Sequence, residues 1–119
     1  MKLEDSILKT VREAMGLGVD DTSFDSELLI HINASLARIN QNGVGNLVLV
    51  SDDTVTWKDF IGEVEVGSDI FHLVPLFVSL NTKLIFDPPP PSTVEQYARS
   101  CDELLWRLKI TSETKGSDI

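Results

Sequence analysis

The sequence has few of the residues that build disulfides and metal sites. It contains one cysteine, Cys101, and two histidines, His31 and His72. A single cysteine excludes an internal disulfide and is typical of a reducing compartment. A metal site at His31 would have Glu27, one helical turn away, as a first partner, but it would need two further ligands. We therefore expect no metal and no cofactor.

Clusters of basic residues and long apolar runs are missing as well. The chain has 10 Lys and Arg residues against 19 Asp and Glu residues, and its formal net charge is -9. A field of this sign repels phosphate, so we expect no binding to DNA through its backbone. No apolar run approaches the ~20 residues of a membrane span, and Met1 to Ser6 lack the apolar stretch of a signal peptide. The sequence thus predicts a soluble protein that is not exported and binds no membrane.

Recognisable catalytic arrangements are missing too. The closest glycines to a phosphate loop, Gly43 and Gly45, follow a predicted helix rather than a strand. Acidic pairs such as Asp52-Asp53 are adjacent in sequence, and neighbouring side chains diverge in regular structure, which does not favour acid–base catalysis. Cys101 falls within an apolar stripe, which favours a buried side chain over a reactive thiol. We expect the protein not to be an enzyme.

What the sequence does contain is helical periodicity. Apolar residues at helical spacing predict main helices over about 4–15, 26–42, 75–87 and 92–110. The third helix is placed from Pro75 because proline suits a first turn, with a possible extra turn before it. This helix is apolar nearly all round and must be covered on several sides, so we expect it to be the central element. The prolines from Pro88 to Pro91 end it.

Short signals predict where the helices begin and end. Gly16 and Gly43 occupy positions that suit left-handed C-terminal caps. Asp25 is predicted to cap the second helix, and Ser92 with Glu95 to cap the fourth. Thr56 begins a further short helix that ends at Gly62.

A different pattern lies between the second helix and the short helix. Leu47 to Val50 is an apolar run rich in β-branched residues, bounded by Gly45 and by Ser51-Asp52-Asp53. It predicts a strand or an extended arm. Such a segment either pairs with a neighbouring subunit by strand addition or covers the core of its own domain, and the sequence leaves both open.

Together these features predict an all-α fold. We expect a small bundle of four main helices, with a short extra helix and an extended or β-like arm between helices two and three. Residues 1–110 form a single helical domain, because no repeat or linker divides them. Residues 111–119 show no periodicity and are predicted to be a flexible C-terminal tail.

The sequence also indicates which residues could meet a partner. Trp57 stands in the first turn of the short helix, and Trp106 lies outside the stripe through Cys101 and Leu108. Each tryptophan either packs at the edge of the core or anchors an interface. The interface candidates are Leu47, Val48, Leu49, Val50, Trp57, Trp106, Lys109 and Ile110.

Several segments in fixed order extend over nearly the whole chain. They are Ser6-Ile7-Leu8, Met15-Gly16-Leu17, Phe24-Asp25, Ile30-His31-Ile32-Asn33, Gly43-Val44-Gly45, Ser51-Asp52-Asp53, Trp57 to Gly62, Lys83 to Pro89 and Glu103 to Leu108. With this ordered set the chain resembles the head–tail connector proteins of tailed phages and prophages, also called head-completion or adaptor proteins.

The resemblance implies a virion structural protein with a small α-helical bundle. It implies that about twelve copies form a ring under the portal protein, extend the DNA channel and receive a tail-side completion protein. DNA would pass through without sequence-specific binding, and part of the acidic surface would face the lumen. The location implied is the head–tail interface of the virion, with the host cytoplasm during assembly. An alternative is a small soluble regulatory or inhibitor protein of phage origin that binds one protein partner.

Overall fold

The computed structural model describes the backbone of residues 1–65 and 67–117 and the side chains of residues 1–65 and 67–112. It contains five helices: α1 (Ile7–Ala14), α2 (Asp25–Gln41), α3 (Trp57–Ile61), α4 (Asp69–Phe86) and α5 (Pro91–Ser117). Within these described ranges there is no strand, and β contact is limited to an isolated bridge between Ser6 and Thr56. The predicted all-α fold is confirmed.

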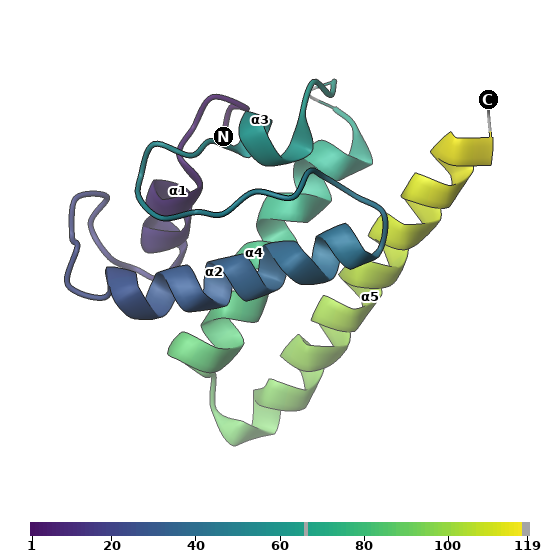
Figure 1. Ribbon diagram of the computed structural model, residues 1–119. Helices are drawn as coiled ribbons and strands as arrows, with labels where there is room; N and C mark the ends of the chain where they lie inside the picture. The colour runs from purple at the N-terminus through teal and green to yellow at the C-terminus, as the bar shows by residue number, and fades with distance from the viewer. Residues whose placement is uncertain (66, 118–119) are drawn as a thin grey trace.

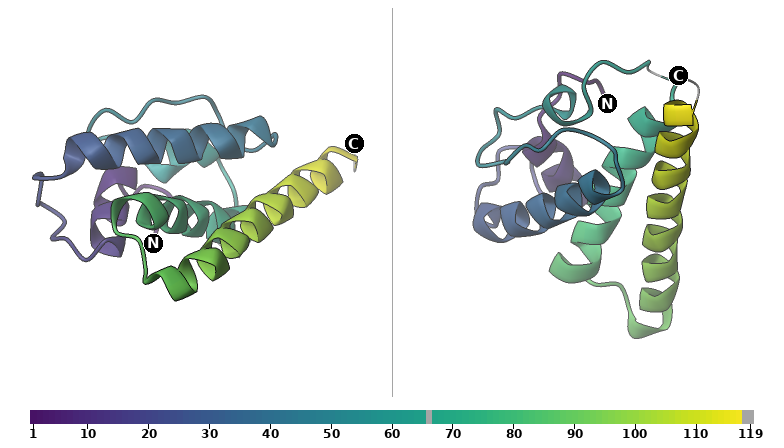
Figure 2. Two further views of the ribbon diagram at one scale, coloured as in Figure 1. Left: turned by 90° about the horizontal axis from the view of Figure 1, so that it is seen from below. Right: turned by 45° about the vertical axis from the view of Figure 1, so that its right-hand side comes forward.

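Helix α4 is the centre of the fold. It forms an antiparallel hairpin with α5 through the proline-rich turn, and α2 crosses it on another side (Figure 1). Helices α1 and α3 also contact α4. Figure 2 shows the α4–α5 hairpin beside α2 from two further directions. The expectation that the apolar third main helix is central is confirmed.

The core is built from the faces that these helices turn toward α4. Its fully buried large side chains come from all five helices and from residue 50. They are Ile7, Leu8, Val11, Leu28, Ile32, Ile39, Val50, Trp57, Phe60, Val74, Phe77 and Leu108. Burying each such side chain contributes about 1.5–3 kcal/mol, so the helix faces rather than local propensities hold the bundle together.

By length and composition alone, α4 passes for a membrane span, with 18 residues and a mean hydropathy of 1.3. In this structure it is the core helix, with Val74, Phe77 and Val78 completely buried by its neighbours. Its apolar character is therefore explained by the bundle.

The predicted start of this helix near Pro75 is wrong, and the extra turn that the sequence left open before Pro75 is present. Helix α4 begins at Asp69, where the Ser68 side chain accepts a hydrogen bond from the Phe71 N–H (3.3 Å). Pro75 lies inside the helix and is buried, and its missing N–H deprives the Phe71 carbonyl of a partner, at a cost of about 3 kcal/mol. Complete burial of Val74 before Pro75 and of Phe77 after it offsets this cost, so packing outweighs the local signal.

Two predicted caps are also wrong. Asp25 is the first residue of α2 rather than its cap, and its carboxylate instead accepts two hydrogen bonds from Arg12. Helix α5 begins at Pro91, one residue before the expected Ser92 cap, and the Thr93 N–H donates to the Pro90 carbonyl (2.8 Å). A proline at the first helical position has no N–H to leave unpaired, which makes the earlier start favourable.

Other helix ends follow the sequence signals. Gly16 and Gly43 have φ of 79° and 86°, the left-handed values that suit glycine after a helix. The residue after each glycine donates its N–H to a carbonyl in the last turn of the helix. Leu17 donates to the Arg12 carbonyl, and Val44 donates to the Ile39 carbonyl. Thr56 and Asp59 form the expected capping box.

The last helix is longer than predicted. Helix α5 continues to Ser117, although the sequence places its end near Ile110. Ser112 Oγ donates to the Gly43 carbonyl (3.0 Å), which ties this turn to the end of α2 without the apolar stripe that periodicity detects. The predicted tail is therefore helical over 111–117, and residues 118–119 lie outside the described residues. Its flexibility stays a prediction.

A polar network joins the three long helices. Asn81 of α4 donates to Ser35 Oγ of α2 (2.8 Å) and accepts from Arg38 (3.1 Å). The Arg38 guanidinium lies 5.4 Å from the centre of the Phe77 ring, and its Nη2 is 3.9 Å from Asp102 of α5. These bonds compensate the burial of Asn81 and Ser35 and fix how α2 crosses α4.

The buried ion pair of Arg12 generates the first prediction. Arg12 binds Asp25 through two nitrogens and the Val19 carbonyl through a third (2.6 Å). Arg12→Ala leaves these acceptors unpaired, and we expect it to lower the free energy of unfolding by about 2–4 kcal/mol. The loss is smaller than for a fully buried ion pair because Asp25 keeps some contact with water. Urea denaturation measures this loss.

The matched control is Arg99→Ala. Arg99 pairs with Glu95 on the exposed side of α5, so its loss should change stability by less than about 0.5 kcal/mol. Equal effects of the two substitutions would contradict the role given to the Arg12 pair.

Candidate functional site

Residues 47–50, here called the arm, lie along α2 and are held at both ends. At one end the Asn33 amide donates to the Val50 carbonyl (2.9 Å) and accepts from the Val50 N–H (2.8 Å). At the other end Asn40 donates to the Gly45 carbonyl (3.0 Å), and the Asn46 N–H donates to the Phe60 carbonyl (2.7 Å). Two side-chain amides and one backbone bond thus hold the ends of the segment, at Val50 and at Gly45 and Asn46.

The arm is not a strand, and the predicted extended conformation stays a prediction. Exposure alternates along it: Leu47 is 87% and Leu49 73% exposed, whereas Val48 is half-buried and Val50 is buried. Within the described part of the chain, no hydrogen bond reaches the backbone of residues 47–49. The arm therefore presents two leucines and unpaired backbone groups to solvent.

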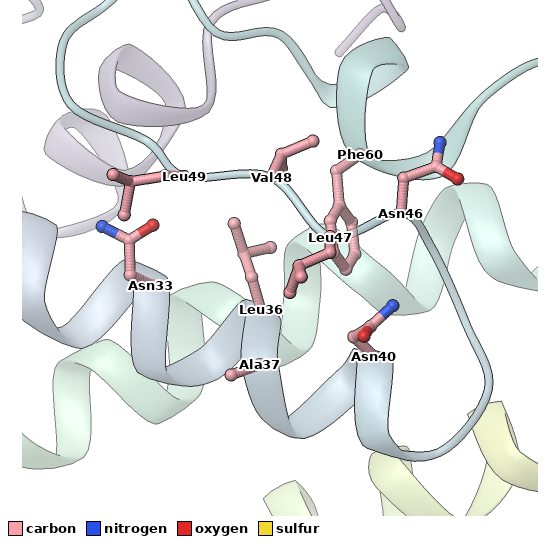
Figure 3. A pocket seen from close by; sticks show the side chains of 9 residues that line it. All are labelled: Asn33, Leu36, Ala37, Asn40, Asn46, Leu47, Val48, Leu49 and Phe60. Carbon is pink, nitrogen blue, oxygen red and sulfur yellow. The ribbon is translucent and has the colours of Figure 1, made fainter.

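A cavity of about 330 Å³ separates the arm from α2. Figure 3 shows the side chains that line it: Asn33, Leu36, Ala37, Asn40, Asn46, Leu47, Val48, Leu49 and Phe60. None of them is charged. A cavity with this lining suits an apolar side chain with a few hydrogen-bonding groups at its edge.

Gly45 is required for the chain to enter the arm. Its φ is +80°, and a Cβ built there would lie 2.6 Å from Cζ of Phe60. Only glycine allows both this conformation and this approach to the ring.

A second exposed surface lies on α5. Trp106 is 62% and Ile110 40% exposed, one helical turn apart on the side opposite the buried Leu104 and Leu108. Together with the exposed Arg107 and Lys109 they form what we call the α5 surface. A hollow of about 290 Å³ separates it from α4; it is lined by Asp69, Leu73, Trp106, Arg107, Ile110 and Thr111.

The interface candidates from the sequence fall into two exposed groups, the half-buried Val48, and the buried Val50 and Trp57. Leu47 and Leu49 belong to the arm, and Trp106, Lys109 and Ile110 belong to the α5 surface. The arm lies along α2, whereas Trp106 and Ile110 flank the start of α4, and the two segments approach each other where Ser112 contacts Gly43.

Trp57 and Val50 have no exposed side chain in this structure. The Trp57 indole N–H donates to Thr10 Oγ1 (3.1 Å), so of the two alternatives for this tryptophan the structure shows core packing.

The remaining reactive side chains are isolated. Cys101 is buried, and this burial raises the pKa of its thiol, which lowers the fraction of reactive thiolate. His31 Nε2 lies 3.9 Å from Glu27 Oε1, one turn away on α2. Among the described residues, no three His, Cys, Asp or Glu side chains come together as a metal site requires.

Sequence reasoning missed the asparagines that hold the arm. Asn33 and Asn40 are seven residues apart, two turns of α2, and lie on the same side as Leu36. Two amides at this spacing beside an apolar run were a detectable signal for a segment bound along the helix.

Comparison with known families agrees with this architecture. The family model described as phage connector protein matches residues 7–115, from the start of α1 into the last turns of α5. The chain therefore belongs to the phage connector protein family, and it is a structural component of the phage particle. Neither the curated proteins nor the solved structures gave a match.

The attachment of the arm generates the second prediction. Asn33→Ala removes both hydrogen bonds to Val50, and we expect amide exchange at Val50 to accelerate by at least about tenfold, the effect of losing about 1.5 kcal/mol of local stability. Hydrogen exchange followed by NMR measures it, with the exposed Gln41→Ala on the same helix as control. An unchanged exchange rate at Val50 would show that the apolar contacts of Val50 alone hold the arm.

Proposed function

We propose that the protein is a head–tail connector subunit that assembles into a ring under the portal protein. The observation that carries the proposal is the family match over residues 7–115, which includes both exposed surfaces. The ring would extend the DNA channel and receive a tail-side completion protein. Its partners would be copies of itself, in a ring of about twelve, and the portal protein.

The exposed apolar residues support this proposal. Leu47 and Leu49 lose the favourable free energy of burial while they face water, and a partner that covers them restores it. The amides of Asn33 and Asn40 hold this segment in place before a partner arrives, which lowers the entropy cost of binding. Nothing in this arrangement requires a cofactor or a catalytic step.

The charge of the chain supports passage of DNA without capture. The net charge is -9, and Lys58 is surrounded by Glu4, Asp59 and Glu63. A channel lined with acids repels the phosphate backbone, whereas basic residues would hold it. We therefore propose that part of the acidic surface faces the lumen, at the head–tail interface of the virion.

The orientation of this charge is the third prediction. In a cryo-EM reconstruction of the assembled ring, we expect more Asp and Glu than Lys and Arg side chains to line the channel, because this limits attraction to DNA. A channel lined mainly by basic residues would contradict the proposal.

The fourth prediction tests assembly through the arm. Leu47→Asp with Leu49→Asp should leave the monomer folded, because both side chains are exposed, with a stability change within about 0.5 kcal/mol. Assembly should be impaired, because the contact would bury two carboxylates. Circular dichroism measures folding, and light scattering after size exclusion, alone and with portal protein, measures assembly.

The matched control is Ile85→Asp, an exposed apolar residue near the end of α4, which should assemble as the wild type does. Unfolding of the arm variant would show that the arm belongs to the core. A wild-type chain that stays monomeric and does not bind portal protein would favour the alternative, a regulatory protein with a single partner.

A further inference from the structure

The segment that contains the arm carries acids alone, whereas the α5 surface carries two bases beside two acids: Glu103, which pairs with Arg107, and Asp69, which lines the same hollow. Residues 45–56 contain Asp52 and Asp53 and no basic residue, whereas residues 104–112 contain Arg107 and Lys109 and no acidic residue. Hydrogen bonds from Thr54 to the Asp52 carboxylate lower its pKa, so this group is ionised at neutral pH. We call Leu47, Leu49, Asp52 and Asp53 the arm surface.

The basic residues of the α5 surface remain available to a second copy. Arg107 pairs with Glu103 one turn before it at 3.7 Å, and both side chains are more than half exposed. An exposed ion pair of this kind contributes little free energy, so little is lost when Arg107 leaves Glu103 to bind another carboxylate. Lys109 is exposed on the same helix.

The apolar residues of the two surfaces match in spacing. Leu47 and Leu49 are two residues apart, which places their Cα atoms at most ~7 Å from each other. Trp106 and Ile110 are one helical turn apart, which corresponds to a rise of ~6 Å along α5. Two leucines on one surface can therefore pack against the tryptophan and the isoleucine on the other.

The charges favour contact between unlike surfaces. A pairing of two arm surfaces would bring Asp52 and Asp53 of one copy beside the same residues of the other, in a chain that already has a net charge of -9. A contact between an arm surface and an α5 surface places acids beside bases and covers apolar residues on both sides.

We propose that the arm surface of one copy binds the α5 surface of the next copy, head to tail. The two surfaces consist of different exposed residues on different elements, so each copy can offer one of each to a neighbour. Contacts of this kind continue from copy to copy and close into a ring when the rotation permits. The inference rests on the proposed function as a ring subunit and specifies how its copies meet.

A mixing experiment tests this arrangement. One variant carries Leu47→Asp and Leu49→Asp, and the other carries Trp106→Ser and Ile110→Asp, all at exposed positions, with circular dichroism as the check of folding. Each variant alone should be monomeric in native mass spectrometry at concentrations where the wild type forms larger species. An equal mixture should give dimers with one copy of each variant and nothing larger, because only one intact pair of surfaces remains.

Charge reversal gives a second test on the same surfaces. Asp52→Lys with Asp53→Lys, and separately Arg107→Glu with Lys109→Glu, should each reduce the oligomer fraction at least about tenfold. A chain that carries all four substitutions should recover most of the wild-type fraction, because the charges are again opposite.

Three results would overturn the inference. An equal mixture that stays monomeric, or an α5 variant that assembles like the wild type, would reject this contact and leave the connector function standing. If the wild type assembles only on portal protein, the test is a disulfide cross-link between neighbouring copies on the portal. The variant carries Leu49→Cys and Ile110→Cys in a Cys101→Ala background, and absence of the cross-link would reject the contact. A wild type that neither assembles nor binds portal protein would reject the connector function itself.

Discussion

Helix α4 is apolar on most of its surface, and the need to cover it decides how the other elements are arranged. Helices α2 and α5 cover two sides, and α1 and α3 complete the enclosure. This requirement is strong enough to keep Pro75 inside the helix, where it costs a hydrogen bond. With α4 packed in this way, the arm on α2 and the outward side of α5 are among the apolar surfaces left exposed, besides Ile30, Leu76 and Ile85. The arm and the α5 surface are the two that we propose for partners.

The fold was predictable where short-range signals decide it. Gly16, Gly43 and the Thr56–Asp59 capping box mark helix ends that the structure confirms, because each acts through residues within one turn. The errors come from partners far along the sequence. Asp25 has the form of a cap but binds Arg12, 13 residues earlier, and the end of α5 is held by Gly43, 69 residues before Ser112.

The candidate site was predictable only in part for the same reason. The pattern of Leu47 to Val50 indicates an extended segment, but the amides that hold its ends, Asn33 and Asn40, lie outside this segment, on α2. For Trp57 and Trp106 the sequence left open whether each packs at the edge of the core or anchors an interface. In the structure Trp57 lies in the core and Trp106 is exposed on α5. Membership of the phage connector protein family is the ground on which we propose that the exposed residues act in virion assembly.

In the ring that we propose for a head–tail connector, copies of this chain meet through the arm surface and the α5 surface. A cryo-EM reconstruction of the connector on its portal tests it most directly. We expect Leu47 and Leu49 of each copy to contact Trp106 and Ile110 of the next copy. Asp52 and Asp53 should then lie near Arg107 and Lys109. A reconstruction in which both surfaces face solvent, or in which like surfaces meet across a two-fold axis, would contradict it.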